Sequence, residues 1–599
     1  MAWYDEAVFY HIYPLGLTGA PKQNDYGEPV HRLNTLLPWV DHIKEIGGSA
    51  LYIGPLFESV GHGYETTDYK KLDSRLGTNE DLTAFVAYCH ERGIKVIFDG
   101  VFNHTGRDFF AFKDIQANRE NSQYKDWYCN VNFWGNNEYN DGFSYDNWGG
   151  YNLLVKLNQK NPAVVDYICD VIRFWVSEFD VDGIRLDAAD VLDFDFMKAL
   201  RRTANEVKPD FWLMGEVIHG DYSRWVNGET LHSVTNYTLH KALYSGHNDH
   251  NYFEIAHTVR RLQNMGTLKL YNFVDNHDVE RIYTKLTNKA HFAPVHVLLY
   301  TLPGVPSIYY GSEFGIEGRK EYGSDDSLRP ALNIEDYKDS VKTNPCTALI
   351  AALGKVRQAV PALSYGSYDE LMLTNRQFAY ARDLDGTRVI VSVNNDDAPA
   401  GMHLAAGNCT AYIGALSGEK VSVQDGHINI TQPANSGEIW VPEGTDLDVK
   451  PVKVVTKTES EAKTNTEDKA ASETATDAKG NKEAEPKIES KESKDIVTAT
   501  ESADAKKNTT NTEKNISAAN EVKDSAKDAS AQAAADTPVD PETITVDWSK
   551  SPESMTVPEL QAAILAKLAG NGPVDAQMKK TVTDNIWHDS LVNWLKSFR

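Results

Sequence analysis

The sequence has few cysteines and no excess of positive charge. Its five cysteines are an odd and widely scattered set, Cys89, Cys129, Cys169, Cys346 and Cys409. This excludes a disulfide framework and fits a reducing compartment. Acidic side chains outnumber basic ones by 86 to 60, which gives a net charge of −26. A nucleic-acid partner is not expected, because neutralising phosphates requires a basic face.

Segments that would direct the chain into or across a membrane are also missing. A membrane span needs about 18 consecutive apolar residues, and the best stretch, around 293–310, is broken by His296, Pro303 and Pro306. The chain opens on Met1-Ala2-Trp3-Tyr4-Asp5-Glu6, without the basic region and apolar run of a secretory leader. We therefore expect a cytoplasmic protein with no membrane partner. An exported protein whose leader has been removed is the alternative.

Aromatic residues are absent between Trp440 and Trp548, where Lys, Glu, Asp, Ala, Thr and Ser dominate. Such a segment buries too little apolar surface to offset the entropy lost on ordering. We predict a disordered linker over 448–540, with transient helix as the alternative. A small helical module is predicted over 541–599, where Leu560, Ile564 and Leu568 recur at helical spacing.

The first 360 or so residues alternate short apolar strands with longer amphipathic segments. Eight strand candidates lie at 8–14, 50–55, 95–103, 183–189, 211–217, 233–239, 268–276 and 306–312. Helical patterns lie at 36–46, 79–92, 162–178, 194–206, 251–264 and 347–359. Eight strands, each followed by a helix or loop, predict an α/β fold with a closed (β/α)8 TIM barrel. A doubly wound open sheet would produce the same alternation.

The predicted barrel is interrupted once and followed by a second domain. Residues 104–182 separate the third strand from the fourth, far more than an ordinary βα connection. Their part 105–160, rich in Asn, Gly, Trp and Tyr, is predicted to be an inserted subdomain, which assigns 1–104 and 161–363 to the barrel. Alternating runs such as 389–393 predict an antiparallel β-domain over 364–447.

Ionisable side chains stand at the carboxyl ends of the fourth and fifth predicted strands, where barrel enzymes form their active sites. In 183–187, Gly-Ile-Arg-Leu-Asp, the two-residue period puts Arg185 and Asp187 on one face. We expect the arginine to lower the pKa of this carboxyl group. Glu216 ends an apolar run, and desolvation should raise its pKa so that it holds a proton. The alternatives are a structural Arg–Asp pair and a solvated strand-end glutamate.

Two further strands end in polar clusters. The third ends Asp99-Gly100-Val101-Phe102-Asn103-His104, and the seventh ends Phe273-Val274-Asp275-Asn276-His277-Asp278. Scaffolding does not readily explain four such clusters converging on one mouth. One carboxylate held ionised and one carboxyl held protonated are the pair that cleavage of a glycosidic bond requires. The sequence therefore indicates a sugar-cleaving active site.

These four motifs, in this order, resemble the α-amylase family, glycoside hydrolase family 13, and the resemblance covers about 1–445. The segment Gly61-His62-Gly63-Tyr64-Glu65-Thr66-Thr67-Asp68-Tyr69 is similar to the family segment that bears a subsite tyrosine. The resemblance implies that Asp187 is the nucleophile, Glu216 the acid/base and Asp278 the carboxylate that holds sugar hydroxyls. The implied contacts to the sugar at the cleaved bond are Tyr64, His104, Arg185 and His277. Asp325 and Arg329 resemble the next-subsite pair.

The resemblance implies a retaining hydrolase of α-1,4-linked glucans, such as maltodextrins and starch-type oligosaccharides. A 4-α-glucanotransferase on the same substrates is the first alternative, and a catalytically inactive glucan-binding relative is the second. The segment 154–158, Leu-Val-Lys-Leu-Asn, resembles one found in neopullulanases, cyclomaltodextrinases and maltogenic amylases. Those enzymes usually carry an N-terminal β-domain, whereas this chain opens on the first predicted barrel strand.

No cofactor is expected. Many secreted α-amylases have a Lys-His pair three and four residues after the nucleophile, and Asp190 and Val191 stand there instead. One ligand of their usual calcium site is thus absent, and Asn103 is the remaining candidate calcium ligand. The expected partner is an α-glucan oligosaccharide. For the C-terminal module, the candidate ligands are an unknown partner or a glucan.

Overall fold

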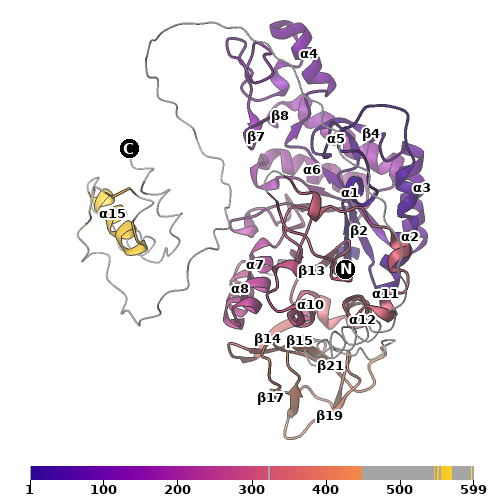
Figure 1. Ribbon diagram of the computed structural model, residues 1–599, viewed down its shortest axis with the longest axis vertical. Helices are drawn as coiled ribbons and strands as arrows, with labels where there is room; N and C mark the ends of the chain where they lie inside the picture. Colours follow the sequence, from indigo (N-terminus) through magenta and orange to yellow (C-terminus); the bar gives the residue numbers. More distant parts are fainter. Residues whose placement is uncertain are drawn as a thin grey trace, which may run out of the picture. The chain divides into compact units, whose positions relative to one another are not determined.

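The computed structural model describes residues 2–266, 268–321, 324–447, 449, 546, 550–551, 555–569 and 595 (Figure 1). The chain divides into two compact units. Apart from Val449, the predicted linker over 448–540 lies outside the described residues, as does most of the predicted C-terminal module.

Eight parallel strands form the central sheet. In chain order they are β1 (Phe9–Ile12), β2 (Ala50–Ile53), β5 (Lys95–Gly100), β9 (Gly183–Leu186), β10 (Trp212–Gly215), β11 (Ser233–Val234), β12 (Tyr271–Asn272) and β13 (Val305–Tyr309). Each strand pairs with the next except at β11 and β12, and β13 returns to β1. Thr235, directly after β11, bridges to Tyr271 in β12. The sheet therefore closes, which confirms the (β/α)8 barrel and excludes the open doubly wound sheet.

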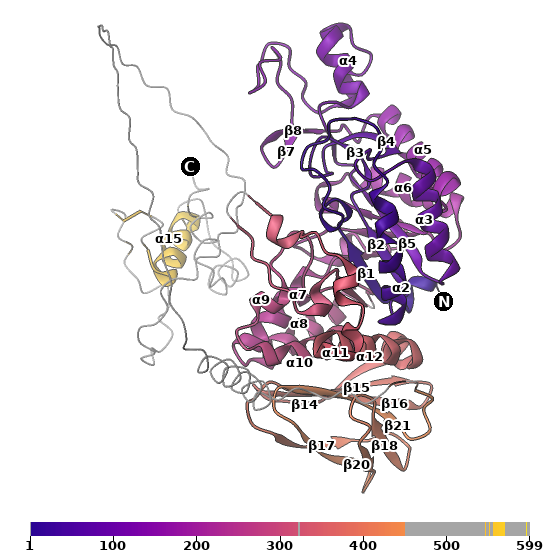
Figure 2. The ribbon, with the colours of Figure 1, turned by 45° about the vertical axis from the view of Figure 1, so that its right-hand side comes forward.

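Helices cover the outside of the barrel (Figure 2). The longer ones are α2 (Leu37–Glu45), α3 (Asn79–Glu91), α5 (Pro162–Phe179), α6 (Phe194–Val207), α7 (Tyr237–Asn248), α8 (Tyr252–Asn264), α10 (Phe292–Thr301) and α12 (Pro345–Ala359). Local sequence explains where several begin. Thr78 and Asp81 form a capping box at α3, and the Asn161 side chain caps α5, whose first residue is proline. Short helices α1 (Pro14–Leu17), α9 (Ile282–Lys285), α11 (Ser340–Thr343) and α13 (Ala362–Tyr365) lie in the connections.

Two of these helices differ from the sequence-based expectation. The predicted strand over 233–239 was too long, because the Asn236 side chain accepts a hydrogen bond from the Leu239 N–H and starts α7. Helix α10 shows no amphipathic pattern because nearly all of its residues are buried. It contacts α12 on one side and strands of the C-terminal sheet on another.

Side chains of the barrel strands alternate between two apolar environments. Those that point inward fill the barrel interior, where Phe9 stacks on Trp212 with ring centroids 4.9 Å apart. Ile184 and Leu186 of β9 instead join the large core shared with the surrounding helices. Arg185 lies between them in sequence and therefore faces inward, as the two-residue period predicts.

Extra strands extend from the carboxyl ends of β2 and β5. A hairpin of β3 (Phe57–Ser59) and β4 (Thr66–Leu72) follows β2. After β5, a small sheet contains β6 (His104–Thr105), β8 (Tyr151–Lys156) and β7 (Asn147–Trp148), with α4 (Phe110–Asn118) beside it. The sheet of β6, β7 and β8, with α4, falls in the part of the chain where an inserted subdomain was predicted, and it lies at one end of the barrel (Figure 2). The β3–β4 hairpin precedes that part of the chain.

The segment after the barrel is an antiparallel β-domain. Its main sheet has the order β14 (Ser367–Leu373), β15 (Gln377–Leu384), β16 (Thr387–Asn394), β21 (Ser436–Pro442), β18 (Ala411–Gly414) and β19 (Lys420–Ser422). A second pair, β17 (Ala400–Ala405) and β20 (His427–Gln432), packs on its apolar face. Asp385-Gly386, both with positive φ, make the two-residue turn between β15 and β16.

Little of the second unit is described. Helix α15 (Val557–Ala569) begins where the Thr556 N–H donates to Glu559 Oε2 at 2.7 Å. Leu560 and Ile564 are buried together with Met555 and Leu595, while the side chain of Leu568 lies outside the described residues. Among the residues that are described, we find no helix that combines the length and the apolarity needed to cross a membrane.

Candidate active site at the carboxyl end of the barrel

Arg185 is the centre of the candidate site. Its Nη1 donates to both carboxylate oxygens of Asp99, at 2.8 and 2.9 Å, and to Asp187 Oδ1 at 3.0 Å. Its Nη2 lies 2.8 Å from Glu216 Oε2. One buried guanidinium thus holds three carboxyl groups, which come from the ends of the neighbouring strands β5, β9 and β10.

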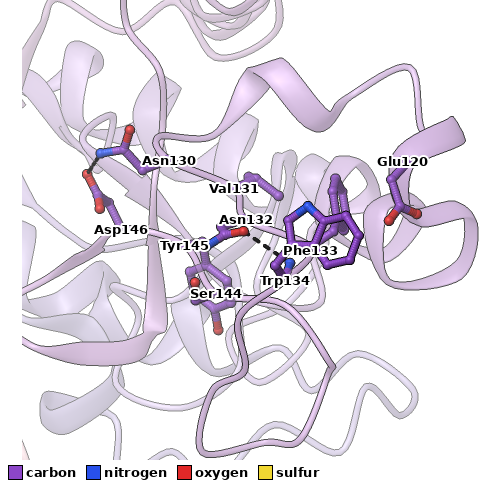
Figure 3. Close-up of a pocket in the computed structure, with 9 residues that line it drawn as sticks. All are labelled: Glu120, Asn130, Val131, Asn132, Phe133, Trp134, Ser144, Tyr145 and Asp146. Carbon is purple, nitrogen blue, oxygen red and sulfur yellow. Dashed lines mark hydrogen bonds between the residues drawn. The ribbon is translucent and has the colours of Figure 1, made fainter.

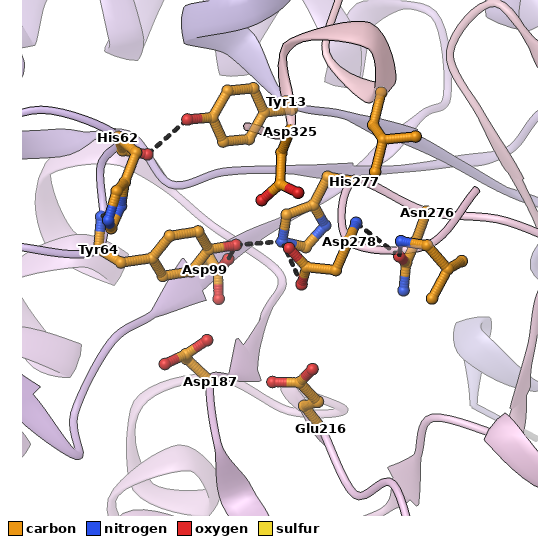
Figure 4. Close-up of polar contacts among 12 residues, drawn as sticks. Tyr13, His62, Tyr64, Asp99, Asp187, Glu216, Asn276, His277, Asp278 and Asp325 are labelled. Carbon is orange, nitrogen blue, oxygen red and sulfur yellow. Dashed lines mark hydrogen bonds and ion pairs between the residues drawn. The ribbon is translucent and has the colours of Figure 1, made fainter. Parts of the chain in front are cut away.

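Asp278 faces this cluster from the end of the seventh strand. In Figure 4 the carboxyl groups of Asp187 and Glu216 point toward one another, and Asp278 lies above them. The Asp278 Oδ2 atom lies 3.1 Å from His277 Nε2, and Arg329 Nη2 donates to its Oδ1 at 2.8 Å. The structure therefore brings all three predicted catalytic carboxyl groups to one place.

Tyrosine and histidine rings form a wall beside these carboxyl groups. The Tyr64 hydroxyl lies 3.2 Å from Asp99 Oδ2 and is hydrogen-bonded to His277 Nε2. The His277 ring stacks between the rings of Tyr64 and Tyr13, with centroid distances of 5.7 and 5.9 Å. Tyr64 and His277 therefore line the same site as the carboxyl groups.

Arg329 links the main cluster to Asp325. Its Nη2 donates to Asp278 and also to Asp325 Oδ2 at 3.0 Å, while its Nε donates to the His277 carbonyl at 3.0 Å. Asp325 and Asp278, the two carboxylates that share this guanidinium, are both partly exposed, and Asp325 is slightly the less exposed of the two. The predicted next-subsite pair is thus hydrogen-bonded directly to the carboxylate cluster.

Two tyrosines of the site were not predicted from the sequence. The Tyr237 hydroxyl donates to Glu216 Oε1 at 3.3 Å, and the Tyr52 hydroxyl donates to Asp99 Oδ2 at 2.8 Å. Tyr237 was missed because it was placed inside a strand, whereas it is the first residue of α7. Tyr52 had a usable signal, since it alternates with Leu51 and Ile53 in β2 and so faces inward.

Burial dominates the protonation of the two carboxyl groups that share Arg185. It raises the pKa of Asp187 well above its usual range, although Arg185 opposes this, and it also raises the pKa of Glu216. The prediction for Glu216 is confirmed, and that of a lowered pKa for Asp187 is wrong. A single guanidinium shared by three carboxyl groups does not offset the desolvation of each. Both carboxyl groups therefore keep a proton to higher pH than an isolated aspartate or glutamate would.

Asp278 behaves in the opposite way. Burial alone would raise its pKa, but its contacts with His277 and Arg329 lower the pKa below the usual range. The candidate site therefore combines one carboxyl group whose pKa is lowered with two whose pKa is raised. Acid–base chemistry on a bound substrate needs this kind of asymmetry.

His104 and Asn103 lie at the edge of the site, after β5. Both are buried, and their side chains contact each other at 3.2 Å. His104 Nε2 is buried without a hydrogen-bond partner. The amide oxygen of Asn103 accepts a hydrogen bond from Gln159 Nε2 at 3.4 Å, so a cation bound by Asn103 would compete with Gln159. Within the described ranges, no cluster of three or more His, Cys, Asp or Glu side chains is arranged to hold a metal.

Comparisons with known proteins agree with this geometry. The family "Alpha amylase, catalytic domain" matches residues 32–355, which include the carboxyl cluster. A cyclomaltodextrinase from Bacillus sp is 31% identical over 422 residues, covering 66% of this chain and 74% of that protein. An intracellular maltogenic amylase from Bacillus subtilis is 28% identical over 418 residues, covering 65% of this chain and 69% of that protein.

A solved structure also resembles this chain. The acarbose-soaked crystal structure of the Nostoc punctiforme debranching enzyme superposes with a TM-score of 0.63 at 26% identity. The match covers 73% of this chain and 98% of that one. Together with the closed barrel and the cluster of carboxyl groups at its mouth, these matches show that the chain belongs to the alpha-amylase family of glycoside hydrolases.

Proposed function

We propose that the enzyme hydrolyses α-1,4-glucosidic bonds of maltodextrins or starch-type oligosaccharides with retention of configuration. In this proposal Asp187 is the nucleophile, Glu216 is the acid/base and Asp278 binds sugar hydroxyls. The observation that supports it is the sharing of Arg185 by Asp187 and Glu216, which brings the two carboxyl groups together around one guanidinium. A retaining mechanism requires two such groups about 5–5.5 Å apart.

The proposed reaction uses a proton on Glu216, whose pKa is raised by burial. Glu216 gives this proton to the glycosidic oxygen while Asp187 attacks the anomeric carbon, forming a covalent β-glycosyl enzyme. Positive charge developing on the sugar favours the ionised form of Asp187, so the proton resides on Glu216 in the reacting complex. Glu216 then acts as the base that activates water, and hydrolysis releases an α-configured product.

The surrounding residues are proposed to bind the sugar at the cleaved bond. His104 is proposed to contact a sugar hydroxyl, and Tyr64 offers an aromatic face beside the carboxyl groups. Arg329 is proposed to act as a positioning residue, because it bonds both Asp278 and Asp325. Asp325 would then meet the next sugar along the chain.

Product analysis on maltotriose, a cyclodextrin, pullulan and soluble starch tests this proposal. We expect maltotriose to yield glucose and maltose from the outset, with no products from Asp187→Asn. Oligomers longer than maltotriose, appearing before glucose and maltose, would instead establish a 4-α-glucanotransferase. Binding of the four glucans without any cleavage would establish an inactive glucan-binding relative. Cleavage of pullulan or cyclodextrin faster than starch would narrow the substrate class.

We also propose that the enzyme works in the cytoplasm. The support is its similarity to a maltogenic amylase named as intracellular and its five free cysteines. Fractionation of the source cells tests this, with activity expected in the cytosolic fraction. Recovery of the protein from the culture medium would contradict it.

A further inference from the structure

A second concavity lies in the region between β6 and β8. Nine residues line a hollow of about 670 Å³, namely Glu120, Asn130, Val131, Asn132, Phe133, Trp134, Ser144, Tyr145 and Asp146 (Figure 3). None of these nine takes part in the hydrogen bonds and ion pairs given above for the catalytic carboxyl groups. The hollow therefore lies outside the polar network of the catalytic carboxyl groups.

Trp134 is the most unusual residue of this hollow. Its exposed fraction is 98%, and the next most exposed large hydrophobic residue in the described part of the chain, Tyr151, reaches 67%. Indole rings are normally buried to a large extent, because leaving so much apolar surface in water is unfavourable. An aromatic ring displayed in this way beside a concavity is typical of a binding surface.

The backbone that displays Trp134 is held in place by hydrogen bonds. Asn132 and Ser144 exchange two backbone hydrogen bonds, at 2.8 and 3.0 Å, and Asp146 N–H donates to the Cys129 carbonyl at 3.0 Å. The Asn132 side chain accepts from the Trp134 N–H at 3.0 Å, and the Gly135 N–H donates to the Asn132 carbonyl at 3.1 Å. The indole is therefore presented on a fixed turn, which lowers the entropy lost on binding a ligand.

The polar groups of the hollow indicate the class of ligand. Glu120 and Asp146 contribute carboxylates, and Asn130 donates to Asp146 Oδ2 at 2.8 Å at the opposite end from Trp134 (Figure 3). No lysine or arginine lines the hollow, which disfavours a phosphorylated or otherwise anionic ligand. Amide and carboxylate oxygens beside an exposed indole suit a neutral molecule with many hydroxyl groups and apolar C–H faces.

We propose that this hollow binds an α-glucan chain at a site separate from the catalytic one, with Trp134 stacking on a sugar ring. The choice of an α-glucan rests on the proposed function, because a polymer held at a second site is also presented to the first. The second contact would raise the effective concentration of long substrates at the catalytic carboxyl groups. Short oligosaccharides, which cannot reach both sites, would gain nothing from it.

Affinity electrophoresis in gels containing soluble starch tests this site. The background is Asp187→Asn, so that the polymer is not consumed during the run. We expect adding Trp134→Ala to weaken retardation, raising the apparent Kd by about three- to tenfold, the range for removing one aromatic contact. Tyr151→Ala is the matched control, since it removes an exposed aromatic of β8, in the same inserted region but outside the hollow. Equal retardation with and without Trp134 would overturn the proposal.

A second measurement separates this inference from the proposed function. In the otherwise wild-type enzyme, we expect Trp134→Ala to lower the ratio of kcat/KM on starch to that on maltotriose, and Tyr151→Ala to leave the ratio unchanged. Failure of the wild-type enzyme to cleave maltotriose would refute the proposed function. The effect of Trp134→Ala on retardation in starch gels would still show whether the hollow binds a glucan. A dimer lost on Trp134→Ala, with starch retardation unchanged, would show that this surface binds a second copy and would overturn the glucan site.

Discussion

Two buried aspartates stand at opposite ends of β9, and their surroundings differ sharply. Asp182 directly precedes the strand, and its carboxylate accepts from the Val96 N–H at 2.9 Å. Lys95 and Lys208 each lie 2.9 Å from it, and His90 lies 2.7 Å from it. This carboxylate has a surplus of cationic and hydrogen-bonding partners.

Asp187 directly follows the same strand and has a deficit of such partners. It shares one guanidinium, that of Arg185, with Asp99 and Glu216. Burial tends to raise the pKa of both aspartates, yet the partners of Asp182 lower its pKa below the usual range, whereas the pKa of Asp187 remains well above it. Burial is common to both, so the number of cations per carboxylate separates a structural aspartate from one suited to chemistry.

The largest expected effect is the loss of activity at the carboxyl end of the strand. Asp187→Asn should lower kcat on maltotriose by at least roughly 10³-fold, because it removes the proposed nucleophile. The matched variant, Asp182→Asn, should keep kcat per folded molecule close to that of the wild type. Steady-state kinetics on purified, folded protein measure both, and full activity of Asp187→Asn would overturn the assignment.

The next effect concerns the proton of Glu216. Because burial raises its pKa, the protonated form persists to higher pH than in an ordinary glutamate, and activity should fall as the pH rises through that pKa. Glu216→Gln should lower kcat by about 10²- to 10⁴-fold on maltotriose and abolish this alkaline decline. The pH profiles of kcat/KM for the wild type and for Glu216→Gln measure the alkaline decline. An unchanged alkaline limb in the variant would assign the proton to another group.

At the amino end of the strand the effect should appear in stability. Asp182→Asn should destabilise the protein by about 2–4 kcal/mol at pH 7, because it leaves buried donors and cations without their carboxylate. The folded pKa of Asp182 lies below its unfolded value. The stability that ionised Asp182 contributes is therefore complete at pH values above its unfolded pKa. This stability declines as the pH falls toward its pKa in the folded protein. Urea unfolding of both proteins at pH 7 and at pH 3 measures this. Asp182→Asn should lower the free energy of unfolding less at pH 3 than at pH 7, and an equal decrease at both would contradict the prediction.

Asp187→Asn should affect stability with the opposite sign. The folded pKa of Asp187 lies above its unfolded value, so the ionisable group costs stability as the pH rises above that unfolded value. Removing it should stabilise the folded protein by about 1–2 kcal/mol near pH 8, and by less near pH 4. Thermal melts across this pH range measure the difference. A destabilised Asp187→Asn would show that Arg185 depends on Asp187 for its charge balance.

The smallest expected effect is that of a chelator. A calcium ion at the barrel mouth would add the positive charge that the Asp187 cluster lacks, but Gln159 already bonds the Asn103 amide oxygen. We predict that EDTA leaves Tm and kcat unchanged within error. A fall in Tm that added Ca²⁺ restores would contradict this prediction, and Asn103→Ala would then show whether Asn103 holds the ion.

Sequence patterns predicted the strand that separates the two aspartates and the face on which Arg185 lies. All eight barrel strands were located as short apolar runs between helical patterns, and polar clusters after four of them mark the carboxyl ends. Helix α10 escaped prediction because it is buried on nearly every side and so has no amphipathic pattern. The raised pKa of Asp187 escaped it because the number of carboxyl groups sharing Arg185 depends on three strands that only the fold brings together.

The assignment of Asp187 as nucleophile is tested most directly by trapping the glycosyl enzyme. Glu216→Gln incubated with α-maltosyl fluoride should accumulate the intermediate, because fluoride leaves without an acid and the variant lacks the base that activates water. Peptide mapping by mass spectrometry should then place one added maltosyl group on Asp187. A maltosyl group on another residue, or release of β-maltose from enzyme that carries none, would contradict the account.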